Sequence, residues 1–173
     1  MKKHELIITP KTKVANLLDN YPQLEDDLIN YVPAFKKLRN PVLRKTVAKI
    51  TTLQQAAAVG NVKVEDLINF LRKKVGQEAV DLESDMQFNT KKPGWFDESR
   101  IKNEIDIREI LNAGEQPVNQ VVSDMKKLER GDILPVIAPF IPAPLIDKSL
   151  SLEMDHWLLK ESDEKFIVYF KKR

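Results

Sequence analysis

The spacing of apolar residues changes part-way along this chain, and the change limits the fold more than any other feature of the sequence. Over the first 75 residues, apolar side chains recur three or four positions apart, which is typical of amphipathic helices. The clearest stripe is formed by Val64, Leu67, Ile68 and Leu71. The final 73 residues alternate between strand-like and helix-like stretches. The sequence therefore predicts an α+β protein, with a small all-α bundle followed by a two-layer α/β sandwich.

This division predicts two domains and a linker. Residues 1–76 are expected to form the helical bundle, residues 101–173 the α/β domain, and residues 77–100 the linker, where helical periodicity is lost. Trp95 and Phe96 follow a Pro-Gly turn signal in the linker. Two large aromatic side chains would be costly in a free linker, so we expect both to dock on one domain and fix the other. A ligand-stacking role is the alternative.

The α/β domain is expected to have the order βαβαββ. Strands are predicted at 105–108, 133–138, 156–160 and 166–170, with helices starting near Pro117 and at Pro142 to Pro144. This order makes a four-stranded mixed sheet with both helices on one face, because a parallel β-α-β crossover is right-handed. Pro135 cannot donate a hydrogen bond to a neighbouring strand, so it is expected at a bulge or a sheet edge.

Composition excludes several kinds of chemistry. The chain has no cysteine, so it has no disulfide, thiolate metal ligand or thiol nucleophile of its own. Its two histidines, His4 and His156, fall in different domains, whereas a transition metal needs three or four ligands. Neither a metal nor a cofactor is expected. The first apolar run is too short for a signal peptide and no stretch could span a membrane, so a cytoplasmic location is expected.

Charge is distributed unevenly. Residues 1–75 hold 14 Lys or Arg against 7 acidic residues, and the remainder holds 14 against 19. This asymmetry indicates either an anionic partner or attraction between the two domains. The densest basic run consists of Lys36, Lys37, Arg39, Arg44, Lys45 and Lys49. Its nearest aromatic residue is Phe35, and a nucleic-acid surface would need more aromatics, which argues against nucleic acid as the partner.

Spaced motifs in the C-terminal half resemble an uncharacterised TusA-like domain family. They follow a Pro93-x-Trp95 start and read Asp106-x-Arg108, Gly114-x-x-Pro117, Leu128-x-x-Gly131-Asp132 and Pro139-Phe140-x-Pro142-x-Pro144-Leu145. The resemblance covers residues 93–173. True TusA-type sulfur carriers hold a persulfide on a cysteine ahead of a Pro-x-Pro at a helix N-terminus. Here Gly114 stands at that position, so the family's transfer chemistry does not carry over.

Residues 7–75 similarly resemble a small helical domain of unknown function. This domain is a relative of the N-terminal domain of iron-sulfur repair proteins and of hybrid-cluster-associated redox proteins. The resemblance depends on Ile8-Thr9, Val14, Phe35-x-x-Leu38-x-Asn40-Pro41-x-x-Arg44 and Thr52-Leu53-x-x-Ala56-Ala57. Those relatives also use cysteines, which this chain lacks.

A ligand site is predicted around the first helix start of the α/β domain. Glycine turns at Gly114 and Gly131 could leave N–H groups free for an anion. The proposed site gathers Asp106, Arg108, Gly114, Glu115 and Pro117, with Phe140, Pro142 and Pro144 as its rim. The alternative is structural: Arg108 pairs with Asp106 or Glu109, and the prolines shape turns. No catalytic residue is identified.

Three functions are compatible with these features. The first is a non-catalytic adaptor built on a degenerate sulfur-carrier scaffold, which binds a protein partner or a small anionic ligand. The second is an accessory factor in redox, sulfur or iron-sulfur metabolism whose thiol comes from a partner, as the resemblance implies. The third is nucleic-acid binding through the basic helical domain.

Overall fold

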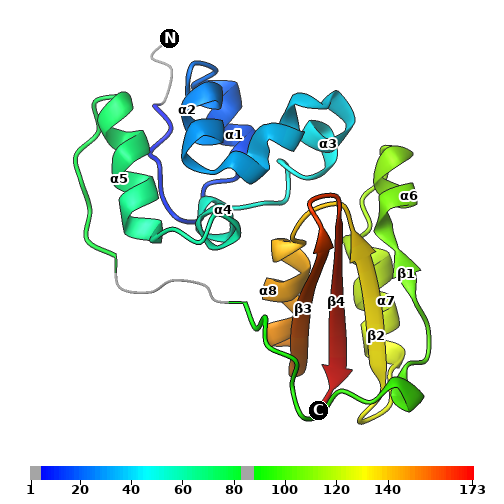
Figure 1. The fold of residues 1–173 in the computed structure, drawn as a ribbon. Helices are drawn as coiled ribbons and strands as arrows, with labels where there is room; N and C mark the ends of the chain where they lie inside the picture. Colours follow the sequence, from blue (N-terminus) through cyan, green and yellow to red (C-terminus); the bar gives the residue numbers. More distant parts are fainter. Residues whose placement is uncertain (1–4, 83–87) are drawn as a thin grey trace. The chain divides into compact units, whose positions relative to one another are not determined.

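A computed structural model describes residues 5–82 and 88–173, and the chain divides into two compact units, Met1–Gln87 and Phe88–Arg173 (Figure 1). Helices make up the first unit. The second holds a mixed four-stranded sheet with helices. The predicted α+β class is confirmed.

Short helices build the first unit around a core of buried aliphatic side chains. They are α1 (Val14–Asn20), α2 (Leu24–Tyr31), the 3-10 helix η1 (Pro33–Arg39), α3 (Pro41–Thr46), α4 (Leu53–Val59) and α5 (Val64–Lys74). The stripe predicted on α5 is confirmed, because its four apolar residues are at most 2% exposed. Burial of this stripe stabilises the helix against its neighbours far more than helix propensity does.

Side-chain caps define where α3 and α4 begin. The Asn40 side chain accepts the N–H of Val42 at 3.0 Å, just ahead of Pro41. At α4, the Thr52 hydroxyl accepts the N–H of Gln55 at 3.2 Å, and the Gln55 side chain accepts the N–H of Thr52 at 3.0 Å. This reciprocal capping box satisfies two N–H groups that a helix start otherwise leaves without partners.

The segment after α5 remains bound to that helix. The Asn69 side chain donates to the Val80 carbonyl at 2.9 Å and accepts the Val80 N–H at 2.8 Å. One turn earlier on the helix, the Glu65 carboxylate accepts the N–H of Leu82 at 3.0 Å. The beginning of the predicted linker 77–100 thus belongs with the helical unit, and the division at residues 87 and 88 falls inside that linker.

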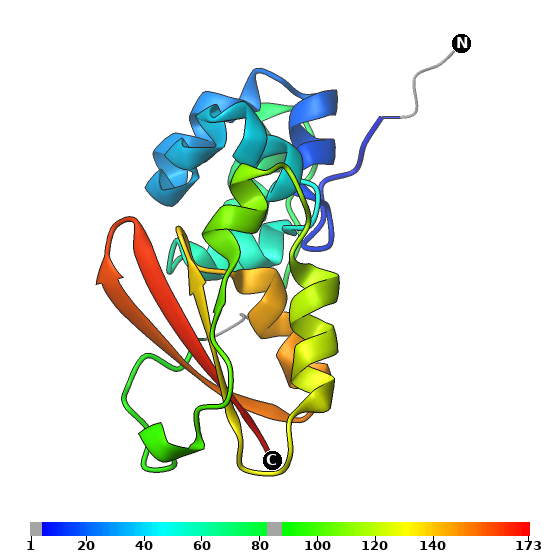
Figure 2. The ribbon, with the colours of Figure 1, turned by 90° about the vertical axis from the view of Figure 1, so that its right-hand side faces the viewer.

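Four strands form the sheet of the second unit in the order β1-β2-β4-β3. They are β1 (Ile105–Asp106), β2 (Ile133–Ala138), β3 (Met154–Ser162) and β4 (Lys165–Lys172). β1 runs parallel to β2, and the other pairs are antiparallel. The helices α7 (Val118–Lys127) and α8 (Ala143–Ser151) lie on one face of the sheet, as predicted (Figure 2).

The first predicted strand is shorter than expected, because a helix begins inside it. β1 covers two residues, and α6 (Ile107–Asn112) follows directly. Asp106 causes this change, since its carboxylate accepts the N–H of Arg108 and caps the helix. Ile107 and Leu111 are then buried four positions apart on one helix face.

Pro135 lies in an inner strand and not at a bulge or edge. The register of β2 with β4 is continuous through Pro135, which pairs with Tyr169. On the other side of β2, the Ile133 carbonyl accepts the N–H of Lys102 at 3.2 Å. Residues two apart in a strand point the same way, so the nitrogen of Pro135 also faces this side. The missing N–H of Pro135 therefore removes no hydrogen bond to β4. On the side that it faces, β1 pairs with Val136 and Ile137 only.

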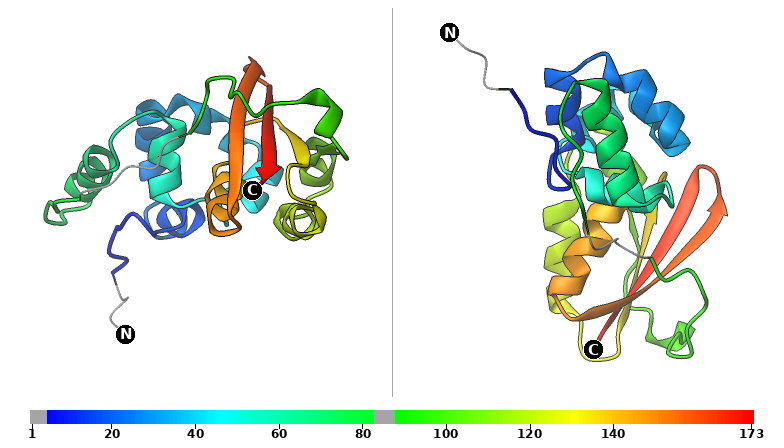
Figure 3. Two further views of the ribbon diagram at one scale, coloured as in Figure 1. Left: turned by 90° about the horizontal axis from the view of Figure 1, so that it is seen from below. Right: turned by 90° about the vertical axis from the view of Figure 1, so that its left-hand side faces the viewer.

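A segment that we call the strap, residues 88–101, crosses the sheet on the face opposite α7 and α8 (Figures 2 and 3). It starts at the outer edge of β3, where the Asn89 carbonyl accepts the N–H of Leu158 at 2.8 Å. It ends beside β2, where Ile101 forms a parallel bridge with Ile133. The strap therefore spans the sheet from one side to the other, although the sequence predicted a linker here.

Aromatic contacts hold the middle of the strap. The ring of Phe96 meets Trp157 and Tyr169 edge-on, with centroids 5.0 and 4.8 Å apart, and those two rings stack on each other at 5.0 Å. Lys171 places its ammonium 5.6 Å from the ring centroid of Trp95. Both predicted docking residues thus contact the second unit.

Removal of the Thr52 hydroxyl tests the capping box. We expect Thr52→Ala to lower the free energy of unfolding of the helical unit by about 1 kcal/mol, because the N–H of Gln55 loses its acceptor. Thr52→Ser keeps the hydroxyl and is the matched control. Urea unfolding followed by circular dichroism measures both, and equal stability of the two variants would contradict this role.

Truncation of Phe96 tests the aromatic attachment of the strap. Phe96→Ala should lower the free energy of unfolding of the second unit by about 2 kcal/mol. This loss is smaller than that for a fully buried ring, because Phe96 is half-buried. Phe96→Leu retains apolar volume and should lose less. Tryptophan fluorescence during urea unfolding reports the change, and wild-type stability in Phe96→Ala would show that the strap is held elsewhere.

Candidate binding face

The face of the sheet opposite α7 and α8 has two halves. In the half nearest the chain's C-terminus, the strap covers Trp157 and Tyr169. In the other half, Asp106 pairs in register with Ile137, and Ile137 with Ile167. Side chains in register on neighbouring strands share a face. We call this second half, next to the β3–β4 turn, the open end of the sheet.

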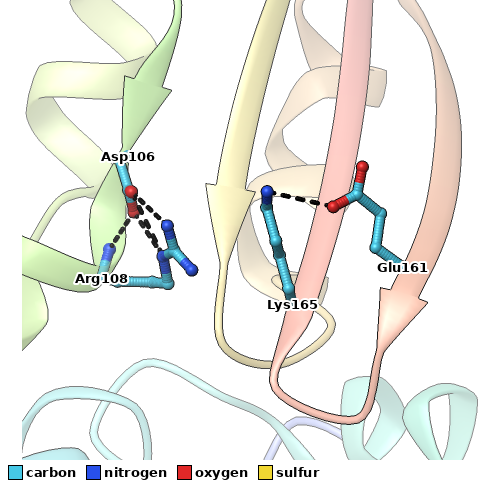
Figure 4. Close-up of polar contacts among 4 residues, drawn as sticks. All are labelled: Asp106, Arg108, Glu161 and Lys165. Atoms are coloured by element: carbon cyan, nitrogen blue, oxygen red, sulfur yellow. Dashed lines mark hydrogen bonds and ion pairs between the residues drawn. The ribbon is translucent and has the colours of Figure 1, made fainter.

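Asp106 and Arg108 form a two-pronged ion pair at the open end (Figure 4). Arg108 donates from Nε to Oδ1 of Asp106 at 2.9 Å and from Nη2 to Oδ2 at 2.6 Å. Hydrogen bonds from the Arg108 side chain lower the pKa of the Asp106 carboxyl, although partial burial opposes this effect. Of the two structural partners that the sequence offered Arg108, Asp106 forms this ion pair.

A second ion pair joins the two strands of the β3–β4 hairpin. Lys165 Nζ lies 3.0 Å from Glu161 Oε2, and both side chains are half-exposed (Figure 4). The two pairs also influence each other weakly. The hydrogen bonds between Asp106 and Arg108 are the main cause of the lowered pKa of Asp106 and the raised pKa of Arg108, and the charges of Lys165 and Glu161 add to these shifts. The four groups therefore act as one electrostatic cluster with two positive and two negative charges.

Gly114 ends a helix and leaves no N–H free, contrary to prediction. Its φ of +79° is the left-handed conformation that follows a helix C-terminus. The Gly114 N–H donates to the Leu111 carbonyl at 2.9 Å, and the Glu115 N–H donates to the Ile110 carbonyl at 3.1 Å. These two hydrogen bonds form a Schellman motif at the end of α6. The prediction of a free N–H group at the Gly114 turn is therefore wrong.

Gly131 also has a structural explanation. Its φ is +89°, its N–H donates to the Lys172 carbonyl at 2.8 Å, and an added Cβ would lie 2.9 Å from Nη2 of Arg100. That guanidinium donates to the Arg130 carbonyl and lies 3.4 Å from a carboxylate oxygen of buried Asp132. Arg100 thus fixes the end of the strap where an anion was predicted.

The remaining predicted site residues shape helix starts. Pro117 is buried and lies immediately before α7. Pro142 is also buried, immediately before α8, and its carbonyl accepts N–H groups from the first turn of that helix. Pro144 is the second residue of α8, and Phe140 is half-buried in the turn between β2 and α8. A binding role for these four residues stays a prediction.

The basic surface predicted on the helical unit is partly neutralised. Arg39 pairs with Asp26 at 3.0 Å and Arg44 with Glu25 at 3.1 Å, both from α2. Phe35 is 5% exposed and is part of the core. Lys36 and Lys45 are exposed and Lys37 is half-buried.

Sequence reasoning missed four residues that organise this face. Glu161 and Lys165 lie between the predicted strands 156–160 and 166–170, yet opposite charges on either side of a hairpin turn are a recognisable signal. Trp157 and Tyr169 lie in strands that were predicted, and strand alternation places each on the face opposite the helices. Their pairing depended on the strand register, which the sequence did not supply.

Residues 8–68 match the family model of a domain of unknown function, DUF1858. This match confirms a helical domain of unknown function in the N-terminal part, and it covers about a third of the chain. Comparison with curated proteins and with solved structures found no match for the chain. The TusA-like resemblance of the C-terminal half stays a prediction.

No helix within residues 5–82 and 88–173 is both long enough and apolar enough to cross a membrane. Among these same residues, no group of three or more His, Cys, Asp or Glu side chains is placed to hold a metal ion.

Substitution of Asp106 separates its cap from its ion pair. Asp106→Ala should lower the free energy of unfolding of the second unit by about 1 kcal/mol or more, because the start of α6 loses its cap. Asp106→Asn keeps an oxygen for the cap and should lose less. Urea unfolding at neutral pH measures both, and equal losses would show that the ion pair alone matters.

The same pair of variants predicts a response to acid. The folded pKa of Asp106 lies below its ordinary value, so its contribution to stability is present above about pH 4 and is lost as pH falls through the folded pKa. Asp106→Asn cannot titrate and should lack this part of the acid sensitivity. Unfolding free energies measured from pH 6 downward provide the comparison.

Proposed function

We propose that this protein is a non-catalytic adaptor that binds a protein partner at the open end of its sheet. One observation supports the proposal most: two half-exposed ion pairs, Asp106–Arg108 and Glu161–Lys165, lie together at the open end of the sheet. Ile137 and Ile167, on the same face of the sheet, are 7% and 6% exposed, so the charged groups are what a partner would contact, as at the polar rim of a protein interface.

The charges of this cluster favour a protein over a small anion. Each cation already contacts a carboxylate of the same chain, so a free anion would compete with Asp106 for Arg108 and with Glu161 for Lys165. A partner surface that bears both signs can align with both pairs at once. Such complementarity gives specificity and a fast association rate.

Nucleic-acid binding has less support. Phe35, the aromatic residue nearest the basic run, is in the core, so its ring is not available for base stacking. The charge asymmetry is also smaller when the sequence is divided at the boundary between the two units and not after residue 75. Residues 1–87 hold 14 basic and 11 acidic residues, a net +3, and residues 88–173 hold 14 and 15, a net −1.

Charge reversal at the open end tests the proposal. In the double variant Arg108→Glu with Lys165→Glu, the affinity for the partner should fall at least tenfold, about 1.4 kcal/mol. The matched control is Lys126→Glu with Lys127→Glu, which changes the same charge on α7, on the other face of the sheet. The wild-type protein is first used to capture the partner from an extract of the cells in which this protein naturally occurs. The partner is then identified and purified, and its affinity for the wild type and for each variant is measured by calorimetry.

Two results would contradict the proposal. Equal affinity of the partner for the wild type and for the open-end variant would place the interface elsewhere. A rise in melting temperature with phosphate or carboxylate compounds that is lost in Arg108→Ala would assign the site to a small anionic ligand.

A further inference from the structure

The start of the strap is held on β3 through one histidine. Nε2 of His156 accepts the N–H of Asn89 at 3.0 Å. The side-chain amide of Asn89 donates to the His156 carbonyl at 3.2 Å, and the Asn89 carbonyl accepts the N–H of Leu158 at 2.8 Å. Next along the strap, the Thr90 carbonyl accepts the indole N–H of Trp157 at 3.3 Å.

The bond from Asn89 to His156 exists in one protonation state only. A neutral imidazole has one nitrogen that accepts a hydrogen bond, and here Nε2 is that nitrogen. In the protonated imidazole both nitrogens carry hydrogen and neither can accept. A proton taken up from solvent at Nε2 would therefore place two N–H donors against each other.

We propose that His156 is a pH-sensitive latch that holds the start of the strap at neutral pH and releases it when the imidazole is protonated. Release frees the N–H of Leu158 and the carbonyl of His156 at the outer edge of the sheet. Backbone groups at an open sheet edge are those that pair with an added strand. The latch is independent of the adaptor proposal, because it needs no partner.

The surroundings of His156 favour the neutral form. Phe170, its cross-strand neighbour on β4, and Asn89 on the strap are uncharged. Asp155 is the charged neighbour on β3, and it pairs with Arg173 at 2.9 Å. On α8, which packs against β3, the charged residues Asp147 and Lys148 are exposed.

Burial lowers the pKa of His156, and Asp155 offsets this only in part. The latched state therefore prefers the neutral imidazole. The stabilisation is complete well above the ordinary histidine pKa of about 6.5, and it is lost as pH falls below that value. The latch should therefore open as pH falls below the ordinary histidine pKa.

Hydrogen exchange measured by NMR tests the latch in the full chain. Protection factors, which correct for the intrinsic pH dependence of exchange, should fall at the Asn89 and Leu158 amides by about tenfold per pH unit once His156 titrates. The titration itself is followed from the imidazole signals. Amides in the centre of β4, such as that of Val168, should keep their protection.

Two variants separate the latch from general stability. His156→Gln carries a side-chain oxygen that accepts a hydrogen bond and does not titrate, so protection at Asn89 should persist and become independent of pH. His156→Leu has no acceptor, so protection at Asn89 should be low at every pH. Unchanged protection at Val168 in both variants shows that the sheet remains folded.

The proposal would be overturned by two results. In one, the Asn89 and Leu158 amides of the wild type stay protected after His156 is fully protonated. In the other, His156→Gln shows the same pH-dependent loss as the wild type, which would assign the effect to another titrating group.

Discussion

The contact of Phe96 with Trp157 and Tyr169 organises the second unit. Because these rings pack together, residues 88–101 cross the sheet as a strap and cover one half of a face that α7 and α8 leave free. The other half of this face remains for the Asp106–Arg108 and Glu161–Lys165 pairs. With the strap in place Trp157 is only 8% exposed, and proteins rarely leave large apolar patches uncovered.

Residues that resemble a ligand site in the sequence are largely used by the fold itself. Asp106 caps α6 and orients Arg108, Gly114 ends the same helix, and Gly131 makes room for Arg100. Motifs of this kind preserve backbone geometry at turns and helix ends, so they report the fold more directly than a function. The half-exposed charges of the two ion pairs are the part of this region that a partner can reach.

Local signals in the sequence predicted the helical unit well. The stripe on α5 was predicted from apolar residues three and four apart, and it is buried as expected. The Asn40 cap and the capping box at Thr52 likewise join residues at most three positions apart. The α/β class and the one-sided placement of α7 and α8 also followed, because strand order and crossover handedness limit the arrangement. α6 was missed because two residues of β1 and the first turn of the helix read together as one alternating strand.

The sequence by itself determined the α+β class, the helix caps and the absence of thiol chemistry, because each depends on composition or on residues close together in the chain. Only the tertiary structure decided that residues 88–101 form a strap, that Glu161 joins Lys165 beside Asp106 and Arg108, and that Asn89 meets His156. Asn89 and His156 are 67 residues apart in sequence. The path of the strap brings these two residues together, and it depends on contacts between segments far apart in the chain, which no local pattern encodes.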